Sequence, residues 1–185
     1  MRASKIMVIR HAEKPDDADP DGLTEAGRPD SESLTARGWE RAKALVGLFA
    51  PKGENPRSGL AIPGSLFASA PGPQSNSQRP IETITPLARK LALQIDTRFV
   101  KGQGAEVAAA ATQTDGVVLI CWQHEEIPEI ALAIKADGGG IPNKWPGKRF
   151  DMVWVFDLLD GGNDYSFSQI AQELLDGDKS EGIQE

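Results

Sequence analysis

The sequence of 185 residues contains one cysteine and two histidines, and aromatic residues make up only 6% of it. A single cysteine excludes a disulfide scaffold and, with no recognisable secretory signal, favours a cytoplasmic protein. No apolar run approaches the ~20 residues that a membrane-spanning helix needs. Hydrophobic residues still make up 39% of the chain, which argues against disorder. This is enough for the core of a single domain over residues 1–185.

An excess of basic residues is also lacking. The net charge is −7, and the segment from Asp157 to the C-terminus holds eight acidic residues and one basic residue, so the rest of the chain is balanced. Without a basic surface, we expect no nucleic-acid partner and no membrane partner. We expect an acidic tail over about 176–185 to be mobile. The sequence does not indicate an oligomeric state.

Short apolar runs alternate with segments of helical periodicity along the chain. This alternation predicts an α/β fold, a three-layer α/β/α sandwich with a mostly parallel central sheet. The expected strands cover 5–9, 66–69, 94–99, 116–121 and 150–156. The expected helices run from the cap at Thr35 to Phe49, over 81–91, around 106–112 and over 127–134, and a closing amphipathic helix carries Phe167, Ile170, Ala171, Leu174 and Leu175.

The two histidines both follow expected buried strands. His11 comes after the strand at 5–9, and His124 comes after the strand at 116–121. Ligands of open α/β sheets bind outside the carboxyl ends of the strands, so we expect the two rings at one edge. Arg10 and Arg79 are expected beside them, and two guanidinium groups can hold a tetrahedral anion. These arginines would repel a cation, and no metal ion is expected.

The segment Arg10-His11-Ala12-Glu13-Lys14-Pro15 resembles the Arg-His-Gly-type signature of the histidine phosphatase superfamily, the phosphoglycerate mutase-like proteins. The segments 34–42 and 69–83, and His124 after its strand, are similar to further family segments in the same order. The resemblance covers residues 5 to about 135. It implies a phosphoglycerate mutase-like fold and a metal-independent phosphatase that needs no cofactor. His11 would be the nucleophile, and Arg10, Arg79 and His124 would bind the phosphate.

The general acid is left open by the sequence. Glu125 is the first choice because it adjoins His124, with Glu106 and Glu13 as alternatives, and a substrate with a good leaving group would need no acid. The substrate is expected to be a phosphorylated small molecule or a phosphoprotein, phosphohistidine included. A phosphoglycerate mutase-type phosphotransferase and a non-catalytic module that binds a phosphorylated ligand are the alternative functions.

Overall fold

The computed structural model describes residues 2–135, 137–162 and 164–184, and this part of the chain forms six strands and four helices. The elements in chain order are β1 (Ala3–Arg10), α1 (Ala36–Phe49), β2 (Ser65–Ala68), α2 (Arg79–Leu91), β3 (Ile95–Asp96), α3 (Gly104–Thr112), β4 (Gly116–Trp122), α4 (Ile127–Ile134), β5 (Met152–Leu158) and β6 (Tyr165–Ala171).

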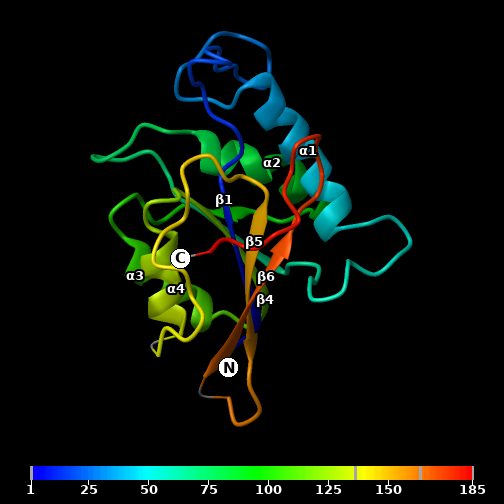
Figure 1. The fold of residues 1–185 in the computed structure, drawn as a ribbon, viewed down its shortest axis with the longest axis vertical. Helices are drawn as coiled ribbons and strands as arrows, with labels where there is room; N and C mark the ends of the chain where they lie inside the picture. The colour runs from blue at the N-terminus through cyan, green and yellow to red at the C-terminus, as the bar shows by residue number, and fades with distance from the viewer. Residues whose placement is uncertain (1, 136, 163, 185) are drawn as a thin grey trace.

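The six strands form one sheet in the order β3-β2-β4-β1-β5-β6. The pairs β2–β3, β2–β4 and β1–β4 are parallel, whereas β5 runs antiparallel to both β1 and β6. Helices α1 and α2 cover one face of the sheet, and α3 and α4 cover the other (Figure 1). The predicted α/β/α sandwich with a mostly parallel sheet is therefore confirmed.

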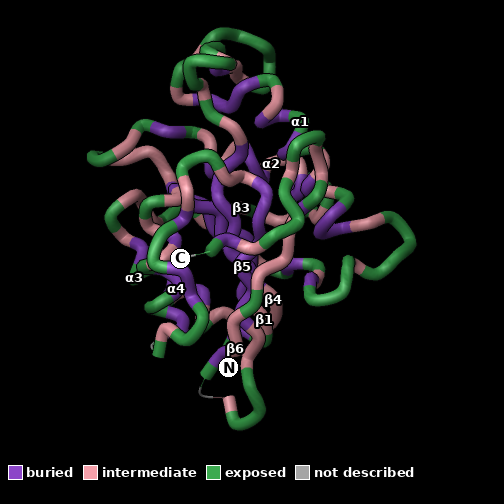
Figure 2. Tube along the Cα trace, viewed as in Figure 1, coloured by how far each residue is buried: buried purple, intermediate pink, exposed green. Residues whose placement is uncertain are grey.

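The alternation of side chains along the central strands produces two cores. Ile6 and Val8 of β1 pack toward α3 and α4, while Met7 and Ile9 pack toward α1 and α2. Successive side chains of a strand point to opposite faces, so a strand covered by helices on both sides must be apolar throughout. Figure 2 shows this buried centre surrounded by exposed loops. The short apolar runs of the sequence are such strands.

The expectation of a closing helix is wrong. Residues 165–171 form β6, which pairs with β5 in the register Phe156↔Phe167 and Val153↔Ile170. Phe167 packs on Trp154 and Phe156, with ring centroids 5.5 and 5.3 Å apart. The apolar spacing of this segment fits a helix as well as a strand, and the unpaired edge of β5 decides between them because its N–H and C=O groups need partners.

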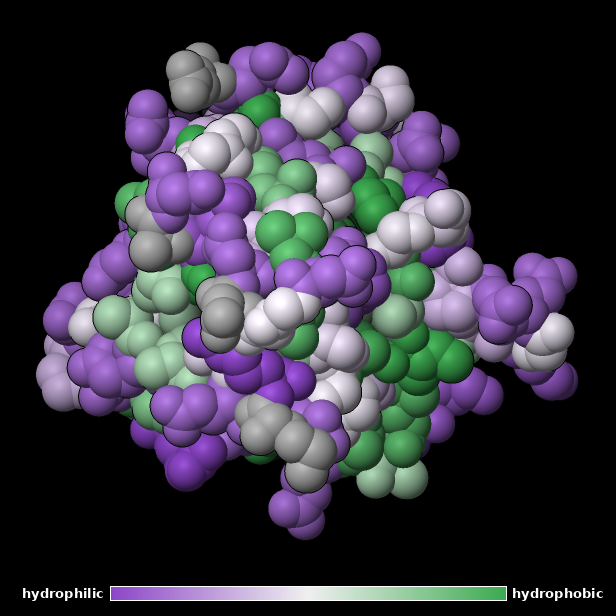
Figure 3. All heavy atoms as spheres, turned by 90° about the horizontal axis from the view of Figure 1, so that it is seen from below, coloured by the Kyte–Doolittle hydropathy of each residue, from purple (hydrophilic) through white to green (hydrophobic). Residues whose placement is uncertain are grey.

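The strand expected over 94–99 is shorter than predicted. Strand β3 covers only Ile95–Asp96, because the Asp96 carboxylate accepts hydrogen bonds from the backbone N–H and the guanidinium of Arg98 and turns the chain there. None of the described helices could cross a membrane. The end of the molecule opposite the carboxyl ends of the parallel strands shows hydrophobic areas among hydrophilic side chains (Figure 3).

The residues after β6 form a C-terminal strap, which we define as residues 172–184. The strap lies against the domain without helix or strand. The backbone N–H of Lys179 donates to Asp151, and the N–H of Ile183 donates to Gln169. Ile183 itself is buried in the core beside α3 and α4. The mobility of 176–185 stays a prediction from the sequence.

Candidate active site

The ends of three neighbouring strands converge at one rim of the sheet. Arg10 ends β1 beside Trp122 at the end of β4, and Ala68 at the end of β2 lies beside Cys121. The hydrogen bonding between β1 and β4 continues past the end of β1, because the N–H of His11 donates to Trp122 O at 3.0 Å. Since these strands are parallel, the residues that follow them meet at this rim. The antiparallel β5 starts at the same rim.

His11 lies at this rim with its ring almost fully buried, at 4% exposure. Its Nδ1 lies 2.8 Å from the backbone oxygen of Ala12, which accepts a hydrogen bond and so keeps the proton on Nδ1. Burial lowers the pKa of His11 well below its usual value, and the positive charges of Arg10 and Arg79 lower it further. The ring is therefore neutral near pH 7, with a lone pair on Nε2.

Arg10 is held beside His11 and is 1% exposed. Its Nη1 donates to Gly147 O at 2.6 Å and to Arg149 O at 3.2 Å, and its guanidinium lies over the ring of Phe150 at 3.8 Å. Burial lowers the pKa of Arg10 to about 10, so the group stays charged near pH 7. These contacts engage one nitrogen and one face of the guanidinium, leaving Nε and Nη2 for another acceptor.

Arg79 opens helix α2, which follows the loop after β2. Its guanidinium donates to the carbonyl oxygens of Ser31 at 2.5 Å and Ser33 at 3.2 Å, and to the hydroxyl of Ser77 at 3.2 Å. Glu82, one turn further along α2, accepts from the Ser33 hydroxyl at 2.7 Å. Helix α2 therefore holds the loop around residues 31–33. Arg79 is also close enough to His11 for its positive charge to lower the pKa of that ring.

The loop after His11 is also tied to helix α2. The N–H of Ala12 donates to the Thr83 hydroxyl at 2.8 Å, and that hydroxyl donates to Arg79 O at 2.7 Å. Thr83 thus connects the backbone beside His11 with the first turn of α2. The ring of His11 and the guanidinium of Arg79 are consequently positioned by the same helix.

His124 follows β4 and is mostly buried, and a Cβ added at Gly147 would lie 3.5 Å from its Nε2. Its Nδ1 lies 3.1 Å from a carboxylate oxygen of Glu125 but is not aligned for a hydrogen bond. Burial and the charge of Arg10 lower the pKa of His124 to about 4, although Glu125 acts in the opposite direction. The ring is neutral near pH 7 until an anion arrives beside it.

A group of buried polar atoms at this rim lacks hydrogen-bond partners among the described residues. The atoms are Arg10 Nε and Nη2, Ser69 Oγ, both amide atoms of Gln123, and His124 Nδ1. All of them follow or end β1, β2 or β4. Buried polar atoms in proteins are nearly always paired, so a run of unpaired groups at one rim indicates a ligand site. Guanidinium, hydroxyl and amide donors suit an oxyanion.

Sequence reasoning did not assign a role to Ser69 or Gln123. Ser69 directly follows β2 and Gln123 directly follows β4, so the strand-end rule that selected the histidines could have selected these residues as well. Their polar groups are buried, which the sequence does not show. We treat them as further candidate ligands of the anion.

The three candidate acids occupy different places. Glu125 lies beside His124 and 3.4 Å from Lys101, and its pKa is below the usual value because its own N–H and the nearby cations outweigh the opposing effect of burial. The Glu13 carboxylate is bound by Arg41 at 2.7 Å. Glu106 is exposed on α3. The structure therefore brings only Glu125 of the three next to His124.

The described residues contain no group of three or more histidine, cysteine or acidic side chains arranged to hold a metal ion. Cys121 is buried in β4, and burial raises the pKa of its thiol, so it is a core residue without a reactive thiolate.

The sequence matches no protein-family model and is not significantly similar to any curated protein. Several solved structures resemble the fold. The protein histidine phosphatase SixA complexed with tungstate has a TM-score of 0.53 and 15% identity, covering 91% of this chain and 97% of that one. Bacillus stearothermophilus YhfR has a TM-score of 0.51 and 14% identity, covering 95% and 98%.

A mycobacterial glucosyl-3-phosphoglycerate phosphatase complexed with VO3 has a TM-score of 0.51 and 11% identity, and the alignment covers 91% of this chain and 97% of that chain. Two of these three structures are named phosphatases, and each aligns over nearly its full length. At these identities, the likeness concerns the fold alone. The chain therefore has the histidine phosphatase fold that the resemblance of the Arg10–Pro15 and His124 segments implies.

Proposed function

We propose that this protein is a metal-independent phosphatase that forms a covalent phosphohistidine on His11. The observation that carries the proposal is the set of buried, unpartnered polar atoms at the ends of β1, β2 and β4. Phosphate oxygens would supply the missing acceptors. Two of the similar structures hold the oxyanions tungstate and VO3, which is in keeping with an anion site in this fold.

The reaction would proceed in two displacements at phosphorus. The neutral His11 attacks with the lone pair of Nε2, a bond forms between Nε2 and phosphorus, and the ester P–O bond breaks with its electrons on the leaving oxygen. That oxygen takes a proton from a general acid or from water. A water molecule then attacks the phosphohistidine, the N–P bond breaks, and inorganic phosphate leaves with the water oxygen.

The remaining side chains would stabilise charge on the transferring group. Arg10 offers Nε and Nη2, Arg79 contributes positive charge that is felt at His11, and His124 becomes a donor once the phosphate raises its pKa. Catalysis of phosphoryl transfer depends mostly on such positioned charges. Ser69 and Gln123 would add neutral donors. A cytoplasmic location and the lack of nucleic-acid and membrane partners stay predictions from the sequence.

The test is phosphate release from a panel of phosphate monoesters and a phosphohistidine protein, in the presence of a chelator. Wild type should turn over an aryl phosphate, tungstate should inhibit it, and His11→Ala should lower kcat by about 10³-fold or more. Acid-quenched wild type should carry an acid-labile, base-stable phosphoryl group that His11→Ala lacks. The exposed Arg98→Ala serves as the control variant and should retain full activity.

The alternatives give different results in the same assays. A mutase-type phosphotransferase would transfer phosphate between hydroxyl groups of phosphoglycerate faster than it releases inorganic phosphate. A non-catalytic module would bind inorganic phosphate by calorimetry with no turnover and no phosphoenzyme. Full activity of His11→Ala, or complete loss of activity on adding a chelator, would overturn the proposal itself.

A further inference from the structure

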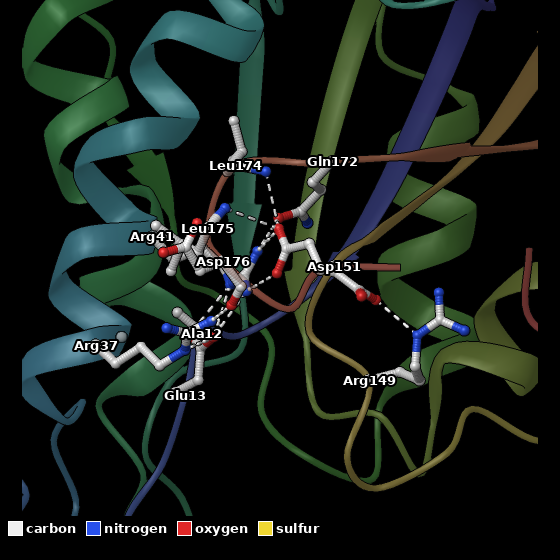
Figure 4. Close-up of polar contacts among 12 residues, drawn as sticks. Ala12, Glu13, Arg37, Arg41, Arg149, Asp151, Gln172, Leu174, Leu175 and Asp176 are labelled. Atoms are coloured by element: carbon white, nitrogen blue, oxygen red, sulfur yellow. Dashed lines mark hydrogen bonds and ion pairs between the residues drawn. The ribbon is translucent and has the colours of Figure 1, made fainter. Parts of the chain in front are cut away.

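A cavity of about 470 Å³ lies next to the proposed phosphate site. Its walls come from the loop after β1, the first turns of α1, the approach to β5 and the C-terminal strap. Figure 4 shows Glu13, Arg37, Arg41 and Asp151 around this region, with the strap at Leu174–Asp176 beside them. Small-molecule sites in proteins have volumes of roughly 300–1,000 Å³. The cavity therefore has the size of a site for a small molecule.

Two residues connect the cavity with the proposed nucleophile. Phe150 lines the cavity, lies under the guanidinium of Arg10 at 3.8 Å, and has its ring centroid 6.3 Å from that of His11. Gly147 also lines the cavity, and its carbonyl oxygen accepts from Arg10 Nη1 at 2.6 Å. A phosphoryl group held by Arg10 and His11 would therefore lie beside the cavity, with room in it for the rest of the substrate.

The charges that line the cavity nearly cancel. The buried Arg41 is bound to both Glu13 and Asp178, Arg37 also pairs with Glu13 at 3.5 Å, and Asp151 is bound to Arg149. These pairs leave the lining with two lysines and two aspartates that form no ion pair with the described residues, namely Lys14, Lys148, Asp16 and Asp19. A cavity with equal numbers of free charges of each sign does not favour a strongly anionic or cationic ligand.

The lining is nevertheless rich in hydrogen-bonding groups and offers one aromatic face. Carboxylates accept hydrogen bonds from hydroxyl groups, and ammonium groups donate to them. The ring of Phe150 presents a flat apolar surface, and Ala18 and Gly177 add little bulk around it. Hydroxyl groups around an apolar ring of C–H bonds match this combination. A sugar or another cyclic polyol has that chemistry.

The burial of His11 and Arg10 also favours a small-molecule substrate. His11 is 4% exposed and Arg10 is 1% exposed, so the proposed nucleophile does not lie on an open surface. A phosphorylated side chain of a folded protein would have to bring its own backbone to this rim. A small phosphate ester can place its leaving group within the cavity beside the rim.

We propose that this cavity binds the leaving group of the substrate and that the substrate is a monophosphate ester of an uncharged, polyhydroxylated small molecule, a sugar or cyclic polyol phosphate. This inference rests on the proposed phosphatase function. The parts of the leaving group that are remote from the breaking bond contribute binding energy. This energy can be used in the transition state, so it appears in kcat/KM. An aryl phosphate without hydroxyl groups would not use the part of this energy that comes from hydrogen bonds to the cavity wall.

The experiment compares kcat/KM for hexose monophosphates and for an aryl phosphate in wild type and two cavity variants. Asp19→Leu removes an acceptor from the cavity wall, and Ala18→Phe fills the cavity. Asp19→Leu should lower kcat/KM for the best hexose monophosphate by about tenfold or more while leaving the aryl phosphate, which has no hydroxyl group to donate, within about twofold. Ala18→Phe should lower kcat/KM for both substrates, because both place their leaving group in the cavity. Asp17→Leu is the matched control, because Asp17 is exposed in the same loop and does not line the cavity.

The outcomes separate this inference from the phosphatase proposal. If the wild type hydrolyses neither the aryl phosphate nor the hexose monophosphates, the phosphatase function is contradicted. Hydrolysis of the aryl phosphate, with hexose phosphates unaffected by Asp19→Leu and Ala18→Phe, would overturn the cavity assignment alone. A clear preference for a phosphohistidine protein would also overturn it. So would a preference for a phosphorylated carboxylate or bisphosphate that is lost in Lys14→Gln or Lys148→Gln, since the cavity would then select an anion.

Discussion

Arg41 of helix α1 binds Glu13, two residues after His11, and Asp178 of the C-terminal strap through the same guanidinium. Its Nη2 lies 2.7 Å from an oxygen of each carboxylate, and its Nη1 donates to the Gln172 amide oxygen at 3.0 Å. Helix α1 packs tightly here, because a Cβ at Gly38 would lie 2.5 Å from Glu13 O. One buried arginine thus joins the loop after the proposed nucleophile to the end of the chain.

Replacement of Arg41 by methionine should be strongly destabilising. The variant leaves the Glu13 and Asp178 carboxylates without their shared cation, and breaking a buried ion pair costs about 3–5 kcal/mol. Urea denaturation should show this loss in the free energy of unfolding, with a smaller loss for Arg41→Lys. Arg37→Met, on the same helix but 42% exposed, should cost less than about 1 kcal/mol. Equal stabilities of Arg41→Met and wild type would contradict the importance of this network.

The stability contributed by Asp178 should depend on pH. Burial alone would raise the pKa of Asp178, but Arg41 and the N–H groups of Leu174 and Leu175 lower it to about 2. The unfolded chain binds a proton more readily, so this contribution is complete above about pH 5 and is lost as the pH falls toward 2.

Unfolding free energies of wild type and Asp178→Asn measure this effect. The wild type should be more stable at pH 6 by on the order of 1–2 kcal/mol, and the difference should shrink toward zero near pH 2.5. A difference that is the same at both pH values would show that the carboxylate makes no pH-dependent contribution. The exposed Asp17→Asn is the control and should show no such dependence.

The two histidine rings should stay neutral near pH 7 when no anion is bound to the protein. The pKa of His11 lies well below its ordinary value, so its ring should stay neutral near pH 7, and that of His124 is about 4, so His124 should show no midpoint between pH 8 and 5. Because the chain has only 2 histidines, NMR resolves both directly, and His124→Gln assigns them. Tungstate should raise the pKa of His124 and bring its midpoint into this range. A midpoint near 6.5 for either ring without an anion would contradict the burial argument.

Replacement of Glu125 by glutamine tests the general acid. A bound phosphate should raise the pKa of the Glu125 carboxyl and allow it to protonate the leaving oxygen. We expect Glu125→Gln to lower kcat by about 100-fold for an alkyl phosphate and by less than about threefold for an aryl phosphate, whose leaving group needs no proton. Glu106→Gln, exposed on α3, should act as wild type. Equal effects on both substrates would exclude Glu125 as the acid.

Several elements were predictable because the local pattern and the fold agree. The run Ile6–Ile9 is apolar on both faces, as a central strand covered by helices must be, and Thr35 caps α1 by accepting from the N–H of Gly38. The segment 165–171 was not predictable, because its apolar residues fit two periodicities. Its structure was decided by β5, whose free edge and aromatic side chains it pairs with.

The candidate site was predictable in the same uneven way. The positions of Arg10, His11, Arg79 and His124 follow from the strand-end rule and from the resemblance, both of which depend on residues close together in the chain. The ion pair of Glu13 does not follow from either of them. Glu13 was a possible acid in the sequence, and it is bound by Arg41 from α1 and by way of that arginine to Asp178, 165 residues away.

The sequence by itself determined the strands and helices with an unambiguous period, the order in which they alternate, and the residues that follow the strands. Those properties depend on neighbours along the chain. Only the tertiary structure decided which polar side chains are buried without hydrogen-bond partners, which carboxylates are paired with a distant arginine, and where a cavity lies beside Phe150. Such properties arise from packing between segments far apart in the sequence, where burial and charge act through space.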